Sequence, residues 1–470
     1  MSLWDGRLCP PNSRYPIPNA FLTHFASLCL SPGFCYSVHM RFYSTHGGAA
    51  TTGFREAVLN GLAPDGGLYM PLTIPQLSPG FFEEARGMSF QKMSCRVAEA
   101  LIGEDLPEAV LNSIVEEAMN FEVPVRRLED GLWVIELFHG PTLAFKDFGA
   151  RFMARLLSHF IAGEQELTIL VATSGDTGSA VAHGFFDVSG VRVIVLYPAG
   201  RVSEIQEKQM ATLGGNITAL KVGGNFDDCQ RLVKEAFQDS ELRSRLRLTS
   251  ANSINIARLI PQSFYYFYAW SRLESVKRPI VISVPSGNFG NLTAGLIAKR
   301  MGLPVYRFVA ATNRNNVVPE YLSTGTFRPR PSIETISNAM DVGNPGNFAR
   351  LQELYARNVV SMRTDLDACS FTDDQTRSAI ADVYRTTGYI LDPHGAVAYL
   401  GAREFLRRHG DGFEAAFLET AHPAKFLDVV ESVLGIRPAL PERLLACLSK
   451  PVLSVPMSNH FEDLKAWLLT

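Results

Sequence analysis

The feature that most constrains the fold of this chain is a series of short, continuously apolar segments that alternate with segments of helical periodicity. The apolar segments are residues 167–172, 191–197, 217–222, 280–284 and 305–311. The segments with helical periodicity are residues 179–186, 203–213, 226–237, 254–270 and 292–300. Strands that are apolar throughout and alternate with helices are typical of a parallel sheet covered on both faces. The sequence therefore predicts an α/β fold, in which ligands bind in the loops that follow the strands.

Length and composition narrow the class of protein. The chain has 470 residues, enough for two large domains or three ordinary ones. Its 44 basic and 47 acidic residues leave a net charge of −3, which argues against a nucleic-acid binder and a polybasic membrane anchor. No segment reaches the ~18 continuous apolar residues of a transmembrane helix. The seven cysteines include no C-x-x-C pair, so we expect a cytoplasmic protein without a zinc ribbon or other metal site.

Residues 1–39 differ in composition from the rest of the chain. They contain three of the seven cysteines, and no acidic residue follows Asp5. A targeting peptide is one interpretation, but only Arg7 and Arg14 are basic and no helical stripe is evident. The sequence favours a disordered, dispensable extension before a working chain that begins at Met40.

Two loops after apolar strands have the composition of anion sites. The first, residues 284–291, carries Gly287 and Gly290 at the start of a helix, where free N–H groups suit a phosphate. It lacks the lysine of a Walker A loop, and a glycine-rich turn with nothing bound is the alternative. The second, residues 172–178, brings three hydroxyl groups to a helix start, which suits a carboxylate or phosphate. Asp176 in this loop is alternatively a simple N-cap.

A lysine and a hydroxyl group complete a possible cofactor site. Lys146 follows the strand 133–137 and starts a helix between Phe145 and Phe148, where apolar surroundings favour loss of its proton. A neutral amine is what an imine with an aldehyde requires, although most lysines simply extend along the surface. Thr420 ends the apolar stretch 415–418 and can bind a ligand or cap the next helix. An amine, a phosphate cradle and a partner for a ring nitrogen are the minimal requirements of pyridoxal phosphate.

The chain from Phe42 onward resembles threonine synthases of the microbial branch, in the fold-type-II family of pyridoxal-phosphate enzymes. The matching stretches are residues 139–151 (HGPTLAFKDFGAR), 172–181 (ATSGDTGSAV), 250–258 (SANSINIAR), 284–295 (VPSGNFGNLTAG), 337–342 (SNAMDV), 393–394 (PH) and 419–426 (ETAHPAKF). They occur in the family's order and cover about nine-tenths of the chain, and their joint occurrence makes the resemblance specific.

The resemblance implies a role for each matching residue. Lys146 is similar to the lysine that forms the imine with the cofactor. The remaining residues that match cofactor-binding positions are Asp176, Gly287, Asn288, Phe289, Gly290, Asn291 and Thr420. The residues implied to bind substrate are Ser174, Gly175, Thr177, Asn252, Ser253, Asn255, Arg258 and Lys425. Arg258 and Lys425 are candidate clamps for a substrate phosphate, although Arg258 could equally pair with a carboxylate on its own helix. One departure is His46, where many relatives have arginine, which leaves the role of that turn open.

The resemblance also implies an architecture and a reaction. We expect two parallel-sheet α/β domains with the cofactor between them, as in the tryptophan synthase β fold. Residues 126–160 and 254–440 would form the larger, cofactor-binding domain and residues 161–253 the smaller one. Residues 40–125 would form an N-terminal cap region, and residues 441–470 a C-terminal tail. The implied reaction converts O-phospho-L-homoserine and water to L-threonine and phosphate, in a monomer or homodimer. A phospho-lyase that yields 2-oxobutyrate and a catalytically silent ligand-binding relative are the alternatives.

Overall fold

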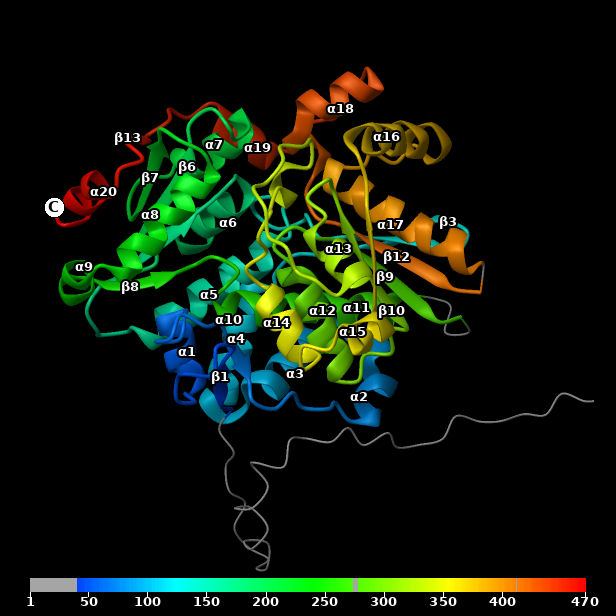
Figure 1. Ribbon diagram of the computed structural model, residues 1–470, viewed down its shortest axis with the longest axis horizontal. Helices are drawn as coiled ribbons and strands as arrows, with labels where there is room; N and C mark the ends of the chain where they lie inside the picture. The colour runs from blue at the N-terminus through cyan, green and yellow to red at the C-terminus, as the bar shows by residue number, and fades with distance from the viewer. Residues whose placement is uncertain (1–39, 274–277, 411) are drawn as a thin grey trace, which may run out of the picture. The chain divides into compact units, whose positions relative to one another are not determined.

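Two separate sheets with parallel strands organise the part of the chain that the structure describes. The computed structural model describes residues 40–273, 278–410 and 412–470, which belong to one compact unit (Figure 1). The larger sheet has six strands, in the spatial order β11 (Leu366–Ser370), β10 (Arg307–Thr312), β9 (Ile280–Pro285), β12 (Glu414–Glu419), β4 (Leu132–Glu136) and β3 (Val125–Glu129). Only β3 is antiparallel to its neighbour.

The smaller sheet is parallel throughout. Its order is β13 (Val455–Met457), β7 (Ile217–Val222), β6 (Val191–Pro198), β5 (Leu167–Ala172) and β8 (Arg247–Ser250). All residues of β5, β9 and β12 are buried, which explains why these strands are apolar on both faces. The two parallel-sheet α/β regions agree with the predicted fold class.

Helices cover both sheets. Those around the smaller sheet are α6 (Asp176–Phe185), α7 (Glu204–Ala211), α8 (Phe226–Gln238), α9 (Ser240–Arg245) and α20 (Phe461–Leu468). Those around the larger sheet are α5 (Lys146–Phe160), α10 (Ile256–Leu259), α11 (Phe264–Arg272), α12 (Gly290–Arg300), α13 (Val317–Thr324), α14 (Phe348–Leu354), α15 (Val359–Asp365), α16 (Asp373–Thr387), α17 (Pro393–His409) and α18 (Leu427–Leu434). The helix α19 (Glu442–Leu448) packs on α7 of the smaller sheet. In Figure 1, α17 runs along the larger sheet, against β9, β10 and β12, and α16 packs on α17.

The N-terminal region packs onto α5 and α11. It consists of β1 (Phe42–Ser44), α1 (Phe54–Asn60), β2 (Tyr69–Pro71), α2 (Pro79–Glu84), α3 (Phe90–Ile102) and α4 (Glu108–Ala118). Its apolar side chains join those of α5 and both sheets in one large hydrophobic cluster. The predicted extension at residues 1–39 lies outside the described residues.

Two predictions differ from the structure. The single helix predicted at residues 254–270 is wrong, because a 3-10 turn, η3 (Ile260–Ser263), separates α10 from α11. Pro261 lies in this turn and has no N–H group to continue an α-helix. Residues 441–470, predicted as a tail, instead contribute β13 to the edge of the smaller sheet. In the same segment, α20 buries Leu464 and Leu468 in the apolar cluster beneath α8.

No helix of the described residues is long and apolar enough to cross a membrane.

Candidate active site

Loops from both sheets meet around a small cavity, which we call the inner cavity. Its volume is about 60 Å³. Its walls come from the loops after β5, β9 and β12, from the starts of α5 and α17, from the segment between β8 and the end of η3, and from the 3-10 turn η4 (Asn338–Met340). The lining residues are Phe145, Lys146, Asp176, Ser253, Arg258, Gln262, Pro285, Gly287, Asn288, Phe289, Gly290, Asn291, Ala339, Met340, His394 and Thr420. The structure thus brings together the lysine, the glycine-rich loop and the threonine that the sequence singles out.

The inner cavity adjoins a larger space, the outer cleft, with a volume of about 1140 Å³. Lys146 and Ser253 line both spaces. Three further residues predicted to bind substrate, Ser174, Thr177 and Asn252, line the outer cleft. A small molecule that enters the outer cleft therefore meets Lys146 at its inner end.

Lys146 is partly buried at the first position of α5. The Phe145 N–H donates to the carbonyl of Thr420 at 2.9 Å, which ties the start of this helix to the end of β12. The pKa of Lys146 is lowered to about 8, mainly because burial disfavours its charge. The nearby positive charge of Arg258 lowers this pKa further, and the negative charge of Asp176 opposes the shift. Lys146 therefore offers a neutral amine at a pH at which an exposed lysine is charged.

The loop from Gly287 to Asn291 presents backbone donors to the inner cavity. The backbone N–H groups of residues 287–292 donate no hydrogen bond to any described residue. Phe289 caps α12 with φ of 60°, a left-handed conformation that is uncommon outside glycine. Such strain persists where the surrounding structure enforces it, as at binding sites. Consecutive free N–H groups at a helix start form a site for an anion.

Asn291 adds a side-chain donor to this loop. Its Oδ1 atom accepts hydrogen bonds from the hydroxyl groups of Tyr265 and Tyr266, at 2.5 and 2.6 Å. These bonds orient the amide, and its buried Nδ2 atom has no partner among the described residues. Asn288, by contrast, donates its amide to Ser253 Oγ at 2.7 Å, so its side chain holds the loop in place.

The loop after β5 forms a second backbone site. Thr173 Oγ1 accepts from the N–H groups of Gly175 and Gly178, at 2.9 and 2.8 Å. Gly175 has φ of 139°, and a Cβ atom there would lie 2.4 Å from the Gln206 side chain, so only glycine fits. The N–H groups of Ser174, Asp176 and Thr177 donate to no other described residue. This helix start is suited to a carboxylate.

Asp176 and Lys425 form a buried ion pair beside the inner cavity. The Lys425 Nζ atom lies 2.7 Å from Asp176 Oδ1, and the side chains are 0% and 6% exposed. Burial alone would raise the pKa of Asp176, but the charge and hydrogen bond of Lys425 bring it below the ordinary value. The predicted role of Lys425 as a clamp for substrate phosphate does not fit this geometry, because its ammonium group is already paired.

Arg258 is a buried cation that forms no ion pair with a carboxylate among the described residues. It is 1% exposed and donates through Nη1 to the carbonyl of Ala251. Its Nε atom has no partner among the described residues. The predicted alternative, an ion pair with a carboxylate of its own helix, is wrong, because α10 has the sequence IARL and contains no acidic residue. Burial lowers the pKa of Arg258 to about 10, so the guanidinium stays charged at neutral pH.

The other predicted substrate residues divide into two groups. Asn252 donates to the carbonyl of Ala172 at 2.8 Å and still lines the outer cleft. Asn255 is fully buried, and its amide is used by the carbonyls of Val58 and Ser250 and by the Ala257 N–H. It lines neither space, so its role is to shape the wall and cap α10 rather than to contact substrate.

Thr420 lines the inner cavity and does not cap a helix. The cap of the next turn, η5 (Pro423–Phe426), is His422, whose side chain accepts from the Ala424 N–H. Behind Thr420, the pKa of Glu419 is raised well above its usual range by burial and by the nearby charge of Asp392.

Sequence reasoning assigned no role to His394 or to its partner Asp392. His394 lines the inner cavity, and Asp392 holds its ring through a 2.6 Å contact to Nδ1. The matching dipeptide at 393–394 was the available signal, but it did not indicate a role.

The turn around His46 is explained by Asp65, whose carboxylate accepts from Ser44 Oγ and from the Gly48 and Gly67 N–H groups. His46 is exposed on this turn.

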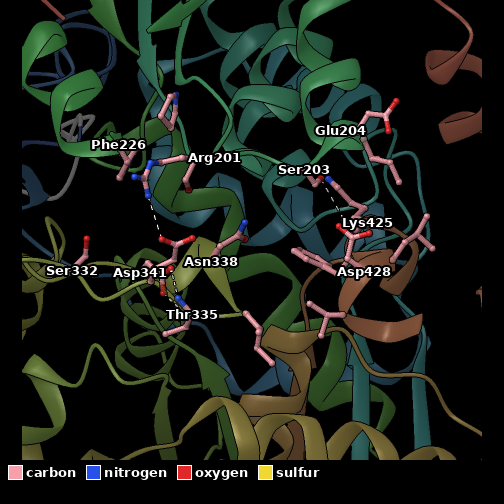
Figure 2. A pocket seen from close by; sticks show the side chains of 18 of the residues that line it. Arg201, Ser203, Glu204, Phe226, Ser332, Thr335, Asn338, Asp341, Lys425 and Asp428 are labelled. Atoms are coloured by element: carbon pink, nitrogen blue, oxygen red, sulfur yellow. Dashed lines mark hydrogen bonds and ion pairs between the residues drawn. The ribbon is translucent and has the colours of Figure 1, made fainter. Parts of the chain in front are cut away.

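A third space, the side pocket, lies next to the site (Figure 2). Its volume is about 710 Å³, and it shares Ser174, Phe226 and Asp341 with the outer cleft. Figure 2 shows Lys425 and Ser203 at one side of it, and Asp341 and Thr335 at the other.

Within residues 40–470, excluding the undescribed positions, no group of three or more His, Cys, Asp or Glu residues could hold a metal ion.

The groups around the inner cavity match one kind of ligand. The amine of Lys146 can bond covalently to an aldehyde. The free N–H groups from Gly287 onward can hold a phosphate, and the hydroxyl of Thr420 can bond a ring nitrogen. The unpaired, buried Asn291 Nδ2 indicates that a ligand supplies an acceptor there. The residues therefore fit pyridoxal phosphate.

Comparisons with known proteins lead to the same family. The model described as "Threonine synthase N terminus" matches residues 41–119, and "Pyridoxal-phosphate dependent enzyme" matches residues 120–414. The model "Threonine synthase, C-terminal" matches residues 395–467. The threonine synthase of Haemophilus influenzae is 48% identical over 417 residues, which cover 88% of this chain and 96% of that protein.

Solved structures agree. The crystal structure of threonine synthase from Escherichia coli superimposes with a TM-score of 0.86 at 44% identity, over 92% of this chain and 99% of that one. The crystal structure of pyridoxal-phosphate-bound threonine synthase from Brucella melitensis superimposes with a TM-score of 0.85 at 36% identity, over 91% of this chain and 98% of that one. The chain therefore belongs to the threonine synthase family, and it is a fold-type-II, pyridoxal-phosphate-dependent lyase of amino-acid biosynthesis.

Proposed function

We propose that this chain converts O-phospho-L-homoserine and water to L-threonine and phosphate. The observation that carries the proposal is the placement of Lys146 beside Arg258 at the inner cavity. The first offers an amine whose pKa is about 8, and the second offers a buried cation whose Nε atom has no described partner. A phosphorylated amino acid needs both a base for its carbon-bound protons and a cation for its phosphate.

The residues proposed to hold the cofactor surround the inner cavity. Lys146 Nζ would form the covalent link to the aldehyde. The N–H groups from Gly287 to Asn291 would bind the phosphate, Thr420 the ring nitrogen, and Asp176 the ring hydroxyl. When bound, pyridoxal phosphate supplies a conjugated system that stabilises negative charge on the substrate carbon chain.

We assign the proton transfers to Lys146. Once the substrate amine has displaced it from the cofactor, the freed Nζ is a neutral amine that can take a proton from the α-carbon and move protons along the carbon chain. Because the pKa of Lys146 is about 8, the same atom can also return a proton near neutral pH. The helix start formed by Ser174, Asp176 and Thr177 is proposed to bind the substrate carboxylate through free N–H groups.

Arg258 is proposed to bind the phosphate that leaves the γ-carbon, while water adds at the β-carbon. A guanidinium that is removed from bulk water interacts more strongly with a phosphate than an exposed one does. Asn252 and Ser253 line the space beside it and can donate to the same group. For each threonine formed, the reaction consumes one O-phospho-L-homoserine and one water and releases one phosphate.

The test is a product analysis with a matched variant. The purified chain, loaded with pyridoxal phosphate, is given O-phospho-L-homoserine, and phosphate, threonine and 2-oxobutyrate are measured together. Phosphate and threonine in equal amounts support the proposal; 2-oxobutyrate in place of threonine identifies the phospho-lyase. Lys146→Ala should release neither product, and borohydride reduction followed by peptide mapping should find the cofactor on Lys146 only in the unmutated chain.

We also propose that the enzyme acts in the cytoplasm as a monomer or homodimer. The described cysteines, Cys95, Cys229, Cys369 and Cys447, are all free thiols, which suits a reducing compartment.

A further inference from the structure

We infer that Lys425 is a positioning residue, which acts on the cofactor site through Asp176 and does not bind the phosphate of the substrate. The inference rests on the proposed place of the cofactor in the inner cavity. It concerns a pair of residues that come from different sheets: Asp176 starts α6 after β5, and Lys425 lies in η5 after β12.

The bonds around the pair leave Lys425 little freedom. Its Nζ atom donates to Asp176 Oδ1 at 2.7 Å and to the carbonyl of Thr142 at 2.9 Å. Its side chain is 0% exposed. Gln206 donates its amide to the same carboxylate oxygen at 3.1 Å, so Asp176 is held from two sides. Lys425 lines the side pocket but neither the inner cavity nor the outer cleft, whereas Asp176 lines the inner cavity.

A buried pair of this kind needs a reason. Removing two charges from water is costly, and a neutral amide at residue 176 would need no partner cation. An ionised carboxylate, however, can only accept hydrogen bonds, whereas an amide can accept or donate. Lys425 therefore keeps residue 176 as a pure acceptor, pointed at the cavity that contains Lys146. Such an acceptor recognises a hydrogen-bond donor of the ligand, and the donor proposed here is the ring hydroxyl of the cofactor.

The pair also joins the two sheets at the site. The segment of Thr142 lies between β4 and α5, on the side of the larger sheet, and Gln209 of α7 donates to the Thr142 carbonyl at 3.1 Å. The Thr142 carbonyl thus receives one donor from each side, Lys425 Nζ and Gln209 Nε2. The position of Asp176 relative to Lys146 consequently depends on Lys425.

A double-mutant cycle tests the inference. The full chains are Lys425→Met, Asp176→Asn and the double variant, and the dissociation constant of pyridoxal phosphate is measured by equilibrium dialysis of each holoenzyme. Either single change leaves one buried charge without its partner, so we expect each to weaken cofactor binding at least about tenfold. The double variant contains no buried lone charge and should bind the cofactor more tightly than either single variant. Lys221→Met, which breaks the partly exposed pair with Glu207 on the smaller sheet, is the matched control and should bind as the unmutated chain does.

Three results would overturn the inference. If the effects on cofactor affinity multiply independently, Lys425 does not act through Asp176. If only the melting temperatures are coupled, the pair is a structural tie alone. If Lys425→Met leaves cofactor affinity and the visible spectrum unchanged but raises KM and weakens inhibition by inorganic phosphate, Lys425 is a phosphate clamp.

Poor folding of Lys425→Met would not remove the test. The double variant is then compared with Asp176→Asn, and the inference requires that adding Lys425→Met improves both cofactor affinity and melting temperature. Peptide mapping of the reduced holoenzyme locates the cofactor independently. A cofactor attached elsewhere than Lys146 would contradict the proposed function, whereas an absent coupling with the cofactor on Lys146 contradicts this inference alone.

Discussion

The N–H group of Ala339 donates a hydrogen bond to Nε2 of His394, with a nitrogen-to-nitrogen distance of 3.2 Å. Because Nε2 accepts this bond, the ring proton belongs on Nδ1, which lies 2.6 Å from Asp392 Oδ1. Ala339 lies in η4 (Asn338–Met340), whose Met340 packs against Gly287 of the proposed phosphate loop. His394 thus connects the start of α17 to the segment that covers this loop.

Substitutions of His394 should separate its two contacts. His394→Gln can still offer an oxygen to Ala339, whereas His394→Asn is too short to reach it but can still donate to Asp392. We expect His394→Asn to weaken pyridoxal phosphate binding about tenfold, the loss of roughly one buried hydrogen bond, and His394→Gln to weaken it less. Equilibrium dialysis of the two holoenzymes measures the difference. Equal affinities would mean that the contact with Ala339 does not support the cofactor site.

Gly287 and Gly290 should respond differently to alanine. A Cβ atom at Gly287 would lie 2.6 Å from the Met340 Cα atom, so backbone must move and about 1–3 kcal/mol of stability should be lost. The nearest atom to a Cβ at Gly290 is Asn347 Nδ2 at 3.3 Å, so Gly290→Ala should leave the melting temperature of the cofactor-free chain nearly unchanged. It should nonetheless weaken cofactor binding, because the methyl group narrows the approach to the free N–H groups. The comparison requires melting temperatures with and without cofactor; equal stability of both cofactor-free variants would contradict it.

The extent to which the sequence predicts this fold depends on burial. Strands such as β5 and β9 are recognisable because they are buried on both faces, and a continuous apolar run leaves little ambiguity. The strands β8, β11 and β13 lie at sheet edges with partly exposed residues, so they have no such run and were not predicted. The break between α10 and α11 at Pro261 could not be predicted from hydrophobic periodicity, because buried apolar residues continue on both sides of it.

The sequence likewise predicts only part of the candidate site. Loops after buried strands indicated the inner cavity, because chemistry in parallel sheets gathers at the carboxyl ends of strands. The partners of the charged groups were not predictable from the sequence, because Lys425 and Asp176 are 249 positions apart and either could have faced solvent or ligand. Likewise, the raised pKa of Glu419 depends on burial and on Asp392, which only the tertiary structure brings together.

The pKa of Lys146 should be visible in the stability of the cofactor-free chain. Its value is about 8 in the folded state and 10.5 in the unfolded state, so between these pH values the unfolded state binds one more proton. Stability should therefore rise with pH across this window, relative to Lys146→Met, which does not titrate. Denaturant unfolding of both chains at pH 7.5, 9 and 10.5 measures this difference. If the two profiles run parallel, Lys146 is not desolvated in the folded state.

A chain that begins at Met40 should fold and turn over like the full chain. The matching family models begin at residue 41, and the described hydrophobic core already includes Phe42 and Phe54, close to the start of the shortened chain. The measurements are the melting temperature and the rate of threonine formation of both chains. A loss of solubility or activity would show that residues 1–39 contribute to the folded enzyme.

The hydroxyl group of Thr420 offers the sharpest test of the proposed cofactor geometry. Thr420→Ser keeps the hydroxyl, Thr420→Val keeps the shape, and Thr420→Asp introduces a carboxylate. Because Thr420 lines the inner cavity and His422 caps the following turn, none of these changes should act through helix capping. Thr420→Ser should retain most activity. Thr420→Val should lose about tenfold in kcat/KM, the cost of about one hydrogen bond to a ring nitrogen.

Thr420→Asp should lose more than Thr420→Val, although aspartate is similar in size. A carboxylate at this position would hold a ring nitrogen in its protonated form by opposite charge, whereas a hydroxyl leaves the ring neutral and a weaker electron acceptor. Phosphate release and threonine formation should therefore fall, and more cofactor should be converted to the transaminated form. Visible spectra and both product assays, run on the three variants, test this order. Activity and spectra like those of the unmutated chain in Thr420→Asp and Thr420→Val would mean that residue 420 does not contact the ring.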